Sequence, residues 1–149
     1  MPTTHVRSAD LPAGLAGRWL LYDASRFELG RLAAQIAMNL MGKDQPTYTP
    51  SEKNGAFVVV VNAAKVKTTG RKDGQKTYVH YTGYPGGQRE VSFARMQARR
   101  PGEVVRLAVK RMLPKNALGH DLLTRLKVYG GPEHPHSAQK PATVEKIRE

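Results

Sequence analysis

The clearest pattern in the chain is a helical repeat of apolar residues between positions 29 and 40. Gly42 follows it, at the position where a left-handed residue ends many helices. Ser25 and Glu28 have the spacing of a capping box, in which each side chain satisfies a free backbone N–H. We therefore predict a capped amphipathic helix whose core-facing residues recur every three or four positions, namely Leu29, Leu32, Ala33, Ile36, Ala37 and Leu40.

Four short runs predict β-strands. Residues 57–61 are five consecutive apolar residues, four of them β-branched, which is typical of a central strand buried on both faces. Residues 19–22 form a shorter apolar run, and residues 77–81 and 126–129 also fit strands. The strand–helix–strand order over residues 19–61 predicts a right-handed βαβ unit.

A second helical pattern covers residues 104–112. Pro101 fits its first turn and Pro114 stops it. Asn116 is placed to cap a further short helix, and Ser92 is placed to cap an earlier one. The apolar face of the second helix consists of Val104, Leu107, Ala108 and Met112, with Arg106, Lys110 and Arg111 off that face.

These elements predict one α/β domain over residues 18–130. Residues 1–17 contain proline and glycine without periodicity, so we expect an irregular N-terminal extension. Residues 131–149 contain further prolines and read as an extended basic C-terminal tail. We find no internal repeat and no second core.

The charge of the chain points to a polyanionic partner. Its 149 residues carry a net charge of +12. Residues 1–64 have 6 basic and 5 acidic side chains, whereas residues 65–149 have 18 basic and 7 acidic ones. Nucleic acid is therefore the first candidate partner, and an anionic membrane surface is the second.

Composition also narrows the location. The chain has no cysteine, which excludes disulfides and thiolate metal sites and permits a reducing compartment. No apolar run approaches the ~20 residues needed to span a bilayer. The N-terminus lacks the apolar core of a secretion signal. We expect a cytoplasmic protein that does not enter a membrane.

Motifs that would indicate an enzyme are missing. A phosphate-binding loop requires glycine where this chain has Ala37, and Ser or Thr where it has Asp44. Gly83, Gly86 and Gly87 lack the dinucleotide-binding spacing and fit a flexible turn. We therefore expect no enzymatic activity, no cofactor and no small-molecule substrate.

A metal site is not expected either. His134 and His136 form the only close histidine pair, and no cysteine or carboxylate cluster completes a ligand set. A hydrogen-bonding or RNA-contacting role in a basic tail suits the pair better.

Basic residues of the second half gather at predicted turns and helix ends. Cations neutralise phosphates and release counterions, while aromatic rings and arginine planes stack on unpaired bases. The interleaved Tyr78, Tyr81 and Tyr84 either fill strands or stack on bases. The candidate RNA-binding residues are Lys65, Lys67, Arg71, Lys72, Lys76, His80, Tyr84, Arg95, Arg99, Arg100, Lys110, Arg111, Lys115, Asn116, His134, His136 and Lys140.

Sequence-specific base reading has no support in the chain. It contains no zinc finger, no heptad zipper, no convincing helix-turn-helix and no aromatic pattern of an RNA-recognition module. Recognition of folded RNA by shape and backbone fits better.

Several runs resemble the family of bacterial large-subunit ribosomal protein thirteen, and they occur in that family's order. They are WLLYDA at 19–24, LGRLA at 29–33, VVNA at 60–63, KTTG at 67–70, GYPGG at 83–87, MLPKN at 112–116 and LKVY at 126–129, followed by HPH at 134–136. The family commonly has glycine where this chain has Arg111, and the N-terminal extension is longer than the family leads one to expect.

The resemblance implies a three-layer α/β/α domain with a mostly parallel four-stranded sheet. It implies a structural constituent of the large ribosomal subunit that binds 23S-type ribosomal RNA, supports early assembly and lies beside neighbouring ribosomal proteins in the cytoplasm. It also implies the absence of catalysis and of a cofactor. Binding of its own messenger RNA as a translational repressor is a second hypothesis, and a nucleotide-using α/β enzyme is a third.

Overall fold

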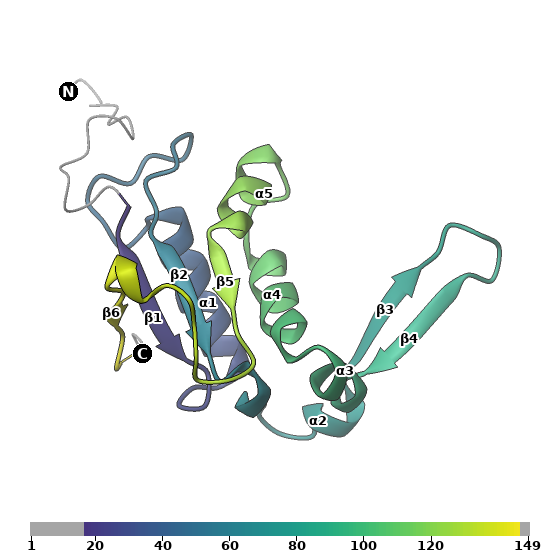
Figure 1. Ribbon diagram of the computed structural model, residues 1–149. Coiled ribbons are helices and arrows are strands. Elements are labelled where there is room, and N and C mark those ends of the chain that lie inside the picture. The colour runs from purple at the N-terminus through teal and green to yellow at the C-terminus, as the bar shows by residue number, and fades with distance from the viewer. Residues whose placement is uncertain (1–16, 147–149) are drawn as a thin grey trace.

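The computed structural model describes residues 17–146, which form an α/β body and a hairpin that projects from it (Figure 1). The N-terminal extension expected at residues 1–17 lies outside the described residues except for Gly17. The elements are β1 (Trp19–Asp23), α1 (Leu29–Met41), β2 (Phe57–Val61), η2 (Ala63–Lys65), α2 (Lys72–Gln75), β3 (Thr77–Tyr81), β4 (Gln88–Ser92), α3 (Phe93–Arg99), α4 (Pro101–Met112), α5 (Ala117–Thr124), β5 (Leu126–Val128), η3 (Ser137–Gln139) and β6 (Ala142–Thr143).

The body is built on a four-stranded parallel sheet in the order β5-β2-β1-β6. β2 is a central strand, and Val58, Val59 and Val60 have no exposed surface. The predicted α/β class, the mostly parallel four-stranded sheet and the βαβ unit are confirmed. The predicted strand at 126–129 is β5, whereas the strand at 77–81 does not join this sheet.

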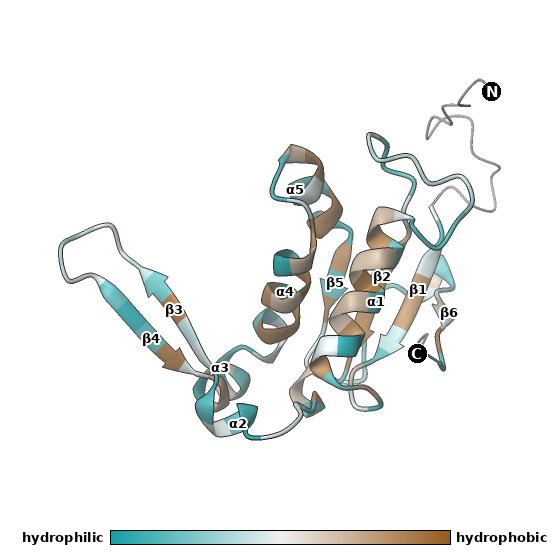
Figure 2. Ribbon diagram, turned by 180° about the vertical axis from the view of Figure 1, so that it is seen from behind, coloured by the Kyte–Doolittle hydropathy of each residue, from teal (hydrophilic) through white to brown (hydrophobic). Residues whose placement is uncertain are grey.

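The long helices α1 and α4 lie together on one face of the sheet (Figures 1 and 2). The crossovers β1–α1–β2 and β2–α4–β5 step in the same direction along the sheet, so right-handed connections place both helices on the same side. The core lies between the helices and the sheet, where Tyr22, Ile36 and Val105 are fully buried. Figure 2 shows this apolar interior in brown.

The segment after β5 crosses the opposite face of the sheet (Figure 1). Trp19 and Phe57 project on that face and stack with their ring centroids 4.8 Å apart. His136 packs against Trp19 at 5.1 Å, and β6 then pairs with β1 at the sheet edge. This third layer is therefore an extended segment that carries only the short helix η3. Sequence reasoning did not predict β6.

The start of α1 differs from the sequence prediction. Glu28 is the N-cap residue and makes no side-chain cap bond, while the Ser25 hydroxyl donates to Asp23 at 2.7 Å. The predicted capping box is therefore wrong. Instead the Leu29 N–H donates to the Lys67 carbonyl at 2.9 Å, so a distant strand-like segment satisfies the helix end. At the other end Gly42 is left-handed, with φ of 78°, as predicted.

β3 and β4 form an antiparallel hairpin that extends away from the body (Figure 1). β4 was not predicted, because four of its five residues are polar and the pattern shows no buried face. Tyr78 is the one residue of β3 that is buried, since it packs back onto the body. Tyr81 and Tyr84 are 60% and 75% exposed.

α4 begins at Pro101 and ends at Met112, as its prolines predict. Asn116 caps α5 by accepting the Gly119 N–H at 2.8 Å, which confirms that prediction. The placement of Met112 in the core is wrong, because this side chain is 44% exposed at the end of the helix. No helix within residues 17–146 has both the length and the apolar character needed to cross a membrane.

Candidate nucleic-acid interface

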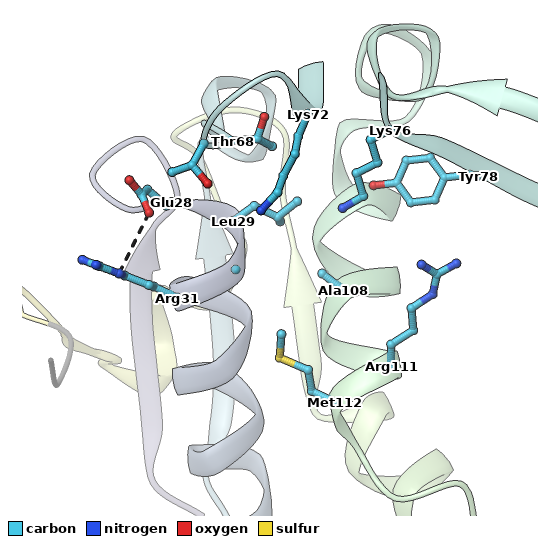
Figure 3. A pocket seen from close by; sticks show the side chains of 12 residues that line it. Glu28, Leu29, Arg31, Thr68, Lys72, Lys76, Tyr78, Ala108, Arg111 and Met112 are labelled. Atoms are coloured by element: carbon cyan, nitrogen blue, oxygen red, sulfur yellow. Dashed lines mark ion pairs between the residues drawn. The ribbon is translucent and has the colours of Figure 1, made fainter. Parts of the chain in front are cut away.

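A cleft of about 450 Å³ opens between the first turn of α1 and the second half of α4 (Figure 3). The start of the hairpin closes one side of it, and the turn before α2 closes another. We call it the α1–α4 cleft. Its lining residues are Glu28, Leu29, Gly30, Arg31, Thr68, Thr69, Lys72, Lys76, Tyr78, Ala108, Arg111 and Met112.

Backbone contacts fix the walls of the α1–α4 cleft. A β-bridge between Glu28 and Lys67 joins the turn before α2 to the start of α1. The Phe93 N–H donates to the Lys76 carbonyl at 2.9 Å, which ties α3 to the base of the hairpin. The Thr68 hydroxyl donates to Asp73, so the turn is held closed on itself. The cationic side chains therefore extend from a supported backbone.

Positive charge dominates the α1–α4 cleft. Arg31 lies 3.9 Å from Glu28, the one carboxylate among the lining residues. Lys76 and Arg111 both lie by the Tyr78 ring, with Lys76 Nζ 5.4 Å and the Arg111 guanidinium carbon 6.0 Å from the ring centroid. Burial lowers the pKa of Lys76, and the nearby charges of Arg111 and Lys72 lower it further.

Tyr78 contributes a buried hydroxyl to the cleft wall. Its side chain is only 5% exposed, and burial raises its pKa although the nearby Arg111 opposes the shift. Its hydroxyl oxygen is enclosed and has no hydrogen-bond partner among the described residues. Figure 3 shows this oxygen beside Lys76, directed toward the space between α1 and α4.

Of the candidate RNA-binding residues, the structure brings Lys72, Lys76 and Arg111 together in the α1–α4 cleft. Lys65, Lys67 and Arg71 lie exposed on the same chain segment. Their assignment to RNA remains a prediction.

The hairpin carries two more candidates outward. His80 and Tyr84 are exposed, and Tyr84 lies in the loop that joins β3 to β4. Figure 1 shows this loop at the end of the hairpin farthest from the sheet. An exposed ring at that distance from the body is free to stack on a partner.

The remaining candidates on helices fall at two corners. Arg95, Arg99 and Arg100 are exposed on α3 and at its junction with α4. Lys110 and Lys115 are exposed near the end of α4 and line a smaller, largely apolar pocket of about 300 Å³ with His120. Asn116 is also exposed, but its side-chain oxygen already serves as the cap of α5.

The C-terminal candidates lie on the other face of the sheet. The His136 ring nitrogen Nε2 lies 2.8 Å from the Tyr129 hydroxyl, and its backbone N–H donates to His134 Nδ1 at 3.2 Å. Together with the stacking on Trp19, these contacts give His136 a role in holding the C-terminal segment against the sheet. Lys140 is exposed beyond η3. The expectation of a basic tail is wrong, because residues 131–149 carry three basic and three acidic side chains.

Sequence reasoning missed several residues of the α1–α4 cleft. Arg31 was not among the candidate RNA-binding residues, and Tyr78 was weighed between strand filling and base stacking without being chosen as a site residue. Met112 was assigned to the core. The alternation of Tyr78 with its neighbours could have indicated a buried position, but nothing local links it to α1.

A metal centre has no support in residues 17–146. This part of the chain contains no group of three or more His, Cys, Asp and Glu side chains arranged to hold a metal ion.

The sequence comparisons agree with one another. A family model described as Ribosomal protein L13 matches residues 17–135. The chain is 55% identical over 130 residues to a large ribosomal subunit protein uL13 of Cyanothece, which covers 87% of each chain. It is 52% identical to the protein of the same name from Chloroflexus aggregans, over 87% of this chain and 91% of the relative.

A third relative comes from another lineage. The large ribosomal subunit protein uL13 of Symbiobacterium thermophilum is 49% identical over 134 residues, which is 90% of this chain and 94% of the relative. The family model covers most of the chain, and each relative is similar over nearly its whole length. The chain therefore belongs to the ribosomal protein L13 family.

Proposed function

We propose that this protein is a structural constituent of the large ribosomal subunit that binds 23S-type ribosomal RNA and supports early assembly of the subunit. As a member of the L13 family it works in the ribosome, in the cytoplasm, and not as an enzyme. The observation that carries the RNA-binding step is the convergence of cations from α2, the base of β3 and α4 in the α1–α4 cleft, where they form no ion pair with any carboxylate of residues 17–146.

The arrangement suits an RNA backbone better than a base sequence. Exposed cations on a rigid surface neutralise phosphates whatever the bases are. The exposed aromatic residues of the hairpin add stacking on unpaired bases. The hairpin also reaches far beyond the body, as Figure 1 shows, so it can enter folded RNA while the body stays outside.

The two edges of the sheet suggest how neighbouring ribosomal proteins would bind. β6 has only two residues and forms one edge of the sheet, and β5 forms the other with three. Short edge strands resist unwanted pairing. We therefore expect contacts with other proteins to be made by side chains and to be secondary to the RNA.

A binding experiment with matched RNAs tests the proposal. The full chain is titrated into fragments of large-subunit RNA, a small-subunit RNA of equal length and a random duplex, at several salt concentrations. We expect tight binding to one or more large-subunit fragments that weakens steeply with salt. Equal affinity for the random duplex at moderate salt would refute the proposal. Co-sedimentation of tagged protein with large subunits gives the corresponding result in the cell.

A further inference from the structure

The α1–α4 cleft holds positive charges without counterions. Lys72, Lys76 and Arg111 all line it, and none of them lies within 4.0 Å of a carboxylate in residues 17–146. The charges repel one another, which is one reason that the pKa of Lys76 is lowered, after burial. A fold that crowds cations in this way is less stable than one that spreads them, unless an anion enters between them.

The Tyr78 hydroxyl is a second, independent feature of the cleft. It is a hydrogen-bond donor on a side chain that is only 5% exposed. A buried hydroxyl without a partner costs free energy, so such groups are rare in folded proteins. Its position beside Lys76 and facing the cleft (Figure 3) means that an anion held by Lys76 would also meet this donor.

The first turn of α1 supplies a third feature. The Leu29 N–H of this turn is already paired with the Lys67 carbonyl, but the next two backbone N–H groups of the turn have no helical partner, and the helix dipole makes this end positive. No acidic residue lies in the first turn of this 13-residue helix. Gly30 lines the cleft and has open space where a side chain would begin, so a ligand can approach the backbone there.

We propose that the α1–α4 cleft is a phosphate-binding pocket that takes backbone phosphate of RNA between the first turn of α1, Lys72, Lys76 and Arg111, with the Tyr78 hydroxyl as a donor. The proposal rests on the proposed function and names the site at which the RNA backbone is held. A volume of about 450 Å³ exceeds that of a lone phosphate and accommodates the adjoining sugar. Glu28 also lines the cleft, and Arg31 Nε lies 3.9 Å from its carboxylate.

The test compares variants that lose equal charge. The site variant carries Lys72→Gln, Lys76→Gln and Arg111→Gln. The control variant carries Lys43→Gln, Lys127→Gln and Lys146→Gln at exposed positions outside the cleft. A third variant, Tyr78→Phe, removes one hydroxyl and no charge. Each full-length protein is titrated, at several salt concentrations, with the large-subunit RNA fragment that the wild type binds. In a separate experiment each protein is titrated with inorganic phosphate while its backbone amide NMR signals are followed.

We expect the site variant to lose at least about tenfold in RNA affinity, because it loses a charge-assisted phosphate contact. The slope of the logarithm of the binding constant against the logarithm of the salt concentration should also become smaller in magnitude by about one. The control variant should stay within about threefold of the wild type, because exposed charges act weakly at a distance. Tyr78→Phe should weaken binding by about tenfold to a hundredfold, the worth of one hydrogen bond to a charged group.

The outcomes separate the two proposals. Equal losses in the site and control variants would overturn the pocket and leave RNA binding by a diffuse field intact. If the wild type bound no large-subunit RNA, the proposed function would fail. In that case phosphate-induced shifts centred on the Gly30 amide, and absent in the site variant, would support a pocket for free phosphate. The absence of such shifts would overturn the pocket as well.

Discussion

Removing the hydroxyl of Tyr78 should stabilise the RNA-free protein, whereas the same change at Tyr22 should destabilise it. Both tyrosines are buried, at 5% and 0% exposure. Their hydroxyls differ in partners: the Tyr22 hydroxyl accepts a hydrogen bond from Asn39 at 2.5 Å, and the Tyr78 hydroxyl has no partner among the described residues. The same substitution at both positions therefore compares a satisfied with an unsatisfied buried hydroxyl.

The size of each effect follows from its surroundings. An unsatisfied buried polar group costs ~1–3 kcal/mol of stability. We expect Tyr78→Phe to gain up to about 1 kcal/mol, the lower limit of this range, because water in the cleft can reach the hydroxyl when Lys76 moves. Tyr22→Phe leaves the buried Asn39 amide without its acceptor and should lose about 1–3 kcal/mol. For a chain of this length, about 1 kcal/mol corresponds to ~2–4 °C in Tm.

Urea unfolding followed by circular dichroism measures both variants against the wild type. A Tyr78→Phe protein that is less stable than the wild type by about 1 kcal/mol or more would refute the reasoning, because the hydroxyl must then have a partner. Tyr78→Ala serves as a control for packing: loss of the ring should cost ~3–5 kcal/mol, so the hydroxyl and the ring are distinguished.

Three further predictions use the same protein. Asn116→Ala should destabilise it by about 1 kcal/mol in urea unfolding, since the cap of α5 is lost. Burial raises the pKa of Tyr22 from 10.0 to about 12, against the opposing hydrogen bond from Asn39, so its contribution to stability is complete below pH 10 and is lost as pH rises through about 12. Unfolding across this range should show a steeper decline for the wild type than for Tyr22→Phe. Three exposed cations can be neutralised together, namely Lys110, Arg111 and Lys115. This change should weaken RNA binding in filter assays and leave Tm nearly unchanged.

The body of the fold could be predicted from sequence because its elements bury continuous faces. The repeat from Leu29 to Leu40 and the run of residues 57–61 specify their elements locally, and the right-handed crossover rule then places α1 on the sheet. The hairpin was only half predicted. β4 faces solvent on both sides along most of its length, so no periodic burial marks it. β6 is too short to leave a pattern at all.

The start of α1 shows how tertiary contacts override local patterns. The spacing of Ser25 and Glu28 fits a capping box, but Asp23 takes the Ser25 hydroxyl and Lys67 supplies its carbonyl to Leu29. A bond to a residue 38 positions away cannot be read from the capping sequence. The same long-range contact creates one wall of the α1–α4 cleft, so the error in the cap and the failure to foresee the cleft have one cause.

Arg111 illustrates the remaining step from residue to site. In the sequence it was one of several cations off the apolar face of a helix, and it replaced a glycine expected from the family resemblance. The structure puts its guanidinium carbon 6.0 Å from the centroid of the Tyr78 ring and makes Arg111 one of the residues that line the α1–α4 cleft. At this position a ligand would therefore meet the positive charge of the Arg111 side chain, whereas a glycine would allow close approach to the backbone. Because Lys72 and Lys76 come from a different segment, the cleft gains its charge density only when α4 packs beside α1. Folding and the proposed RNA binding therefore depend on the same contact.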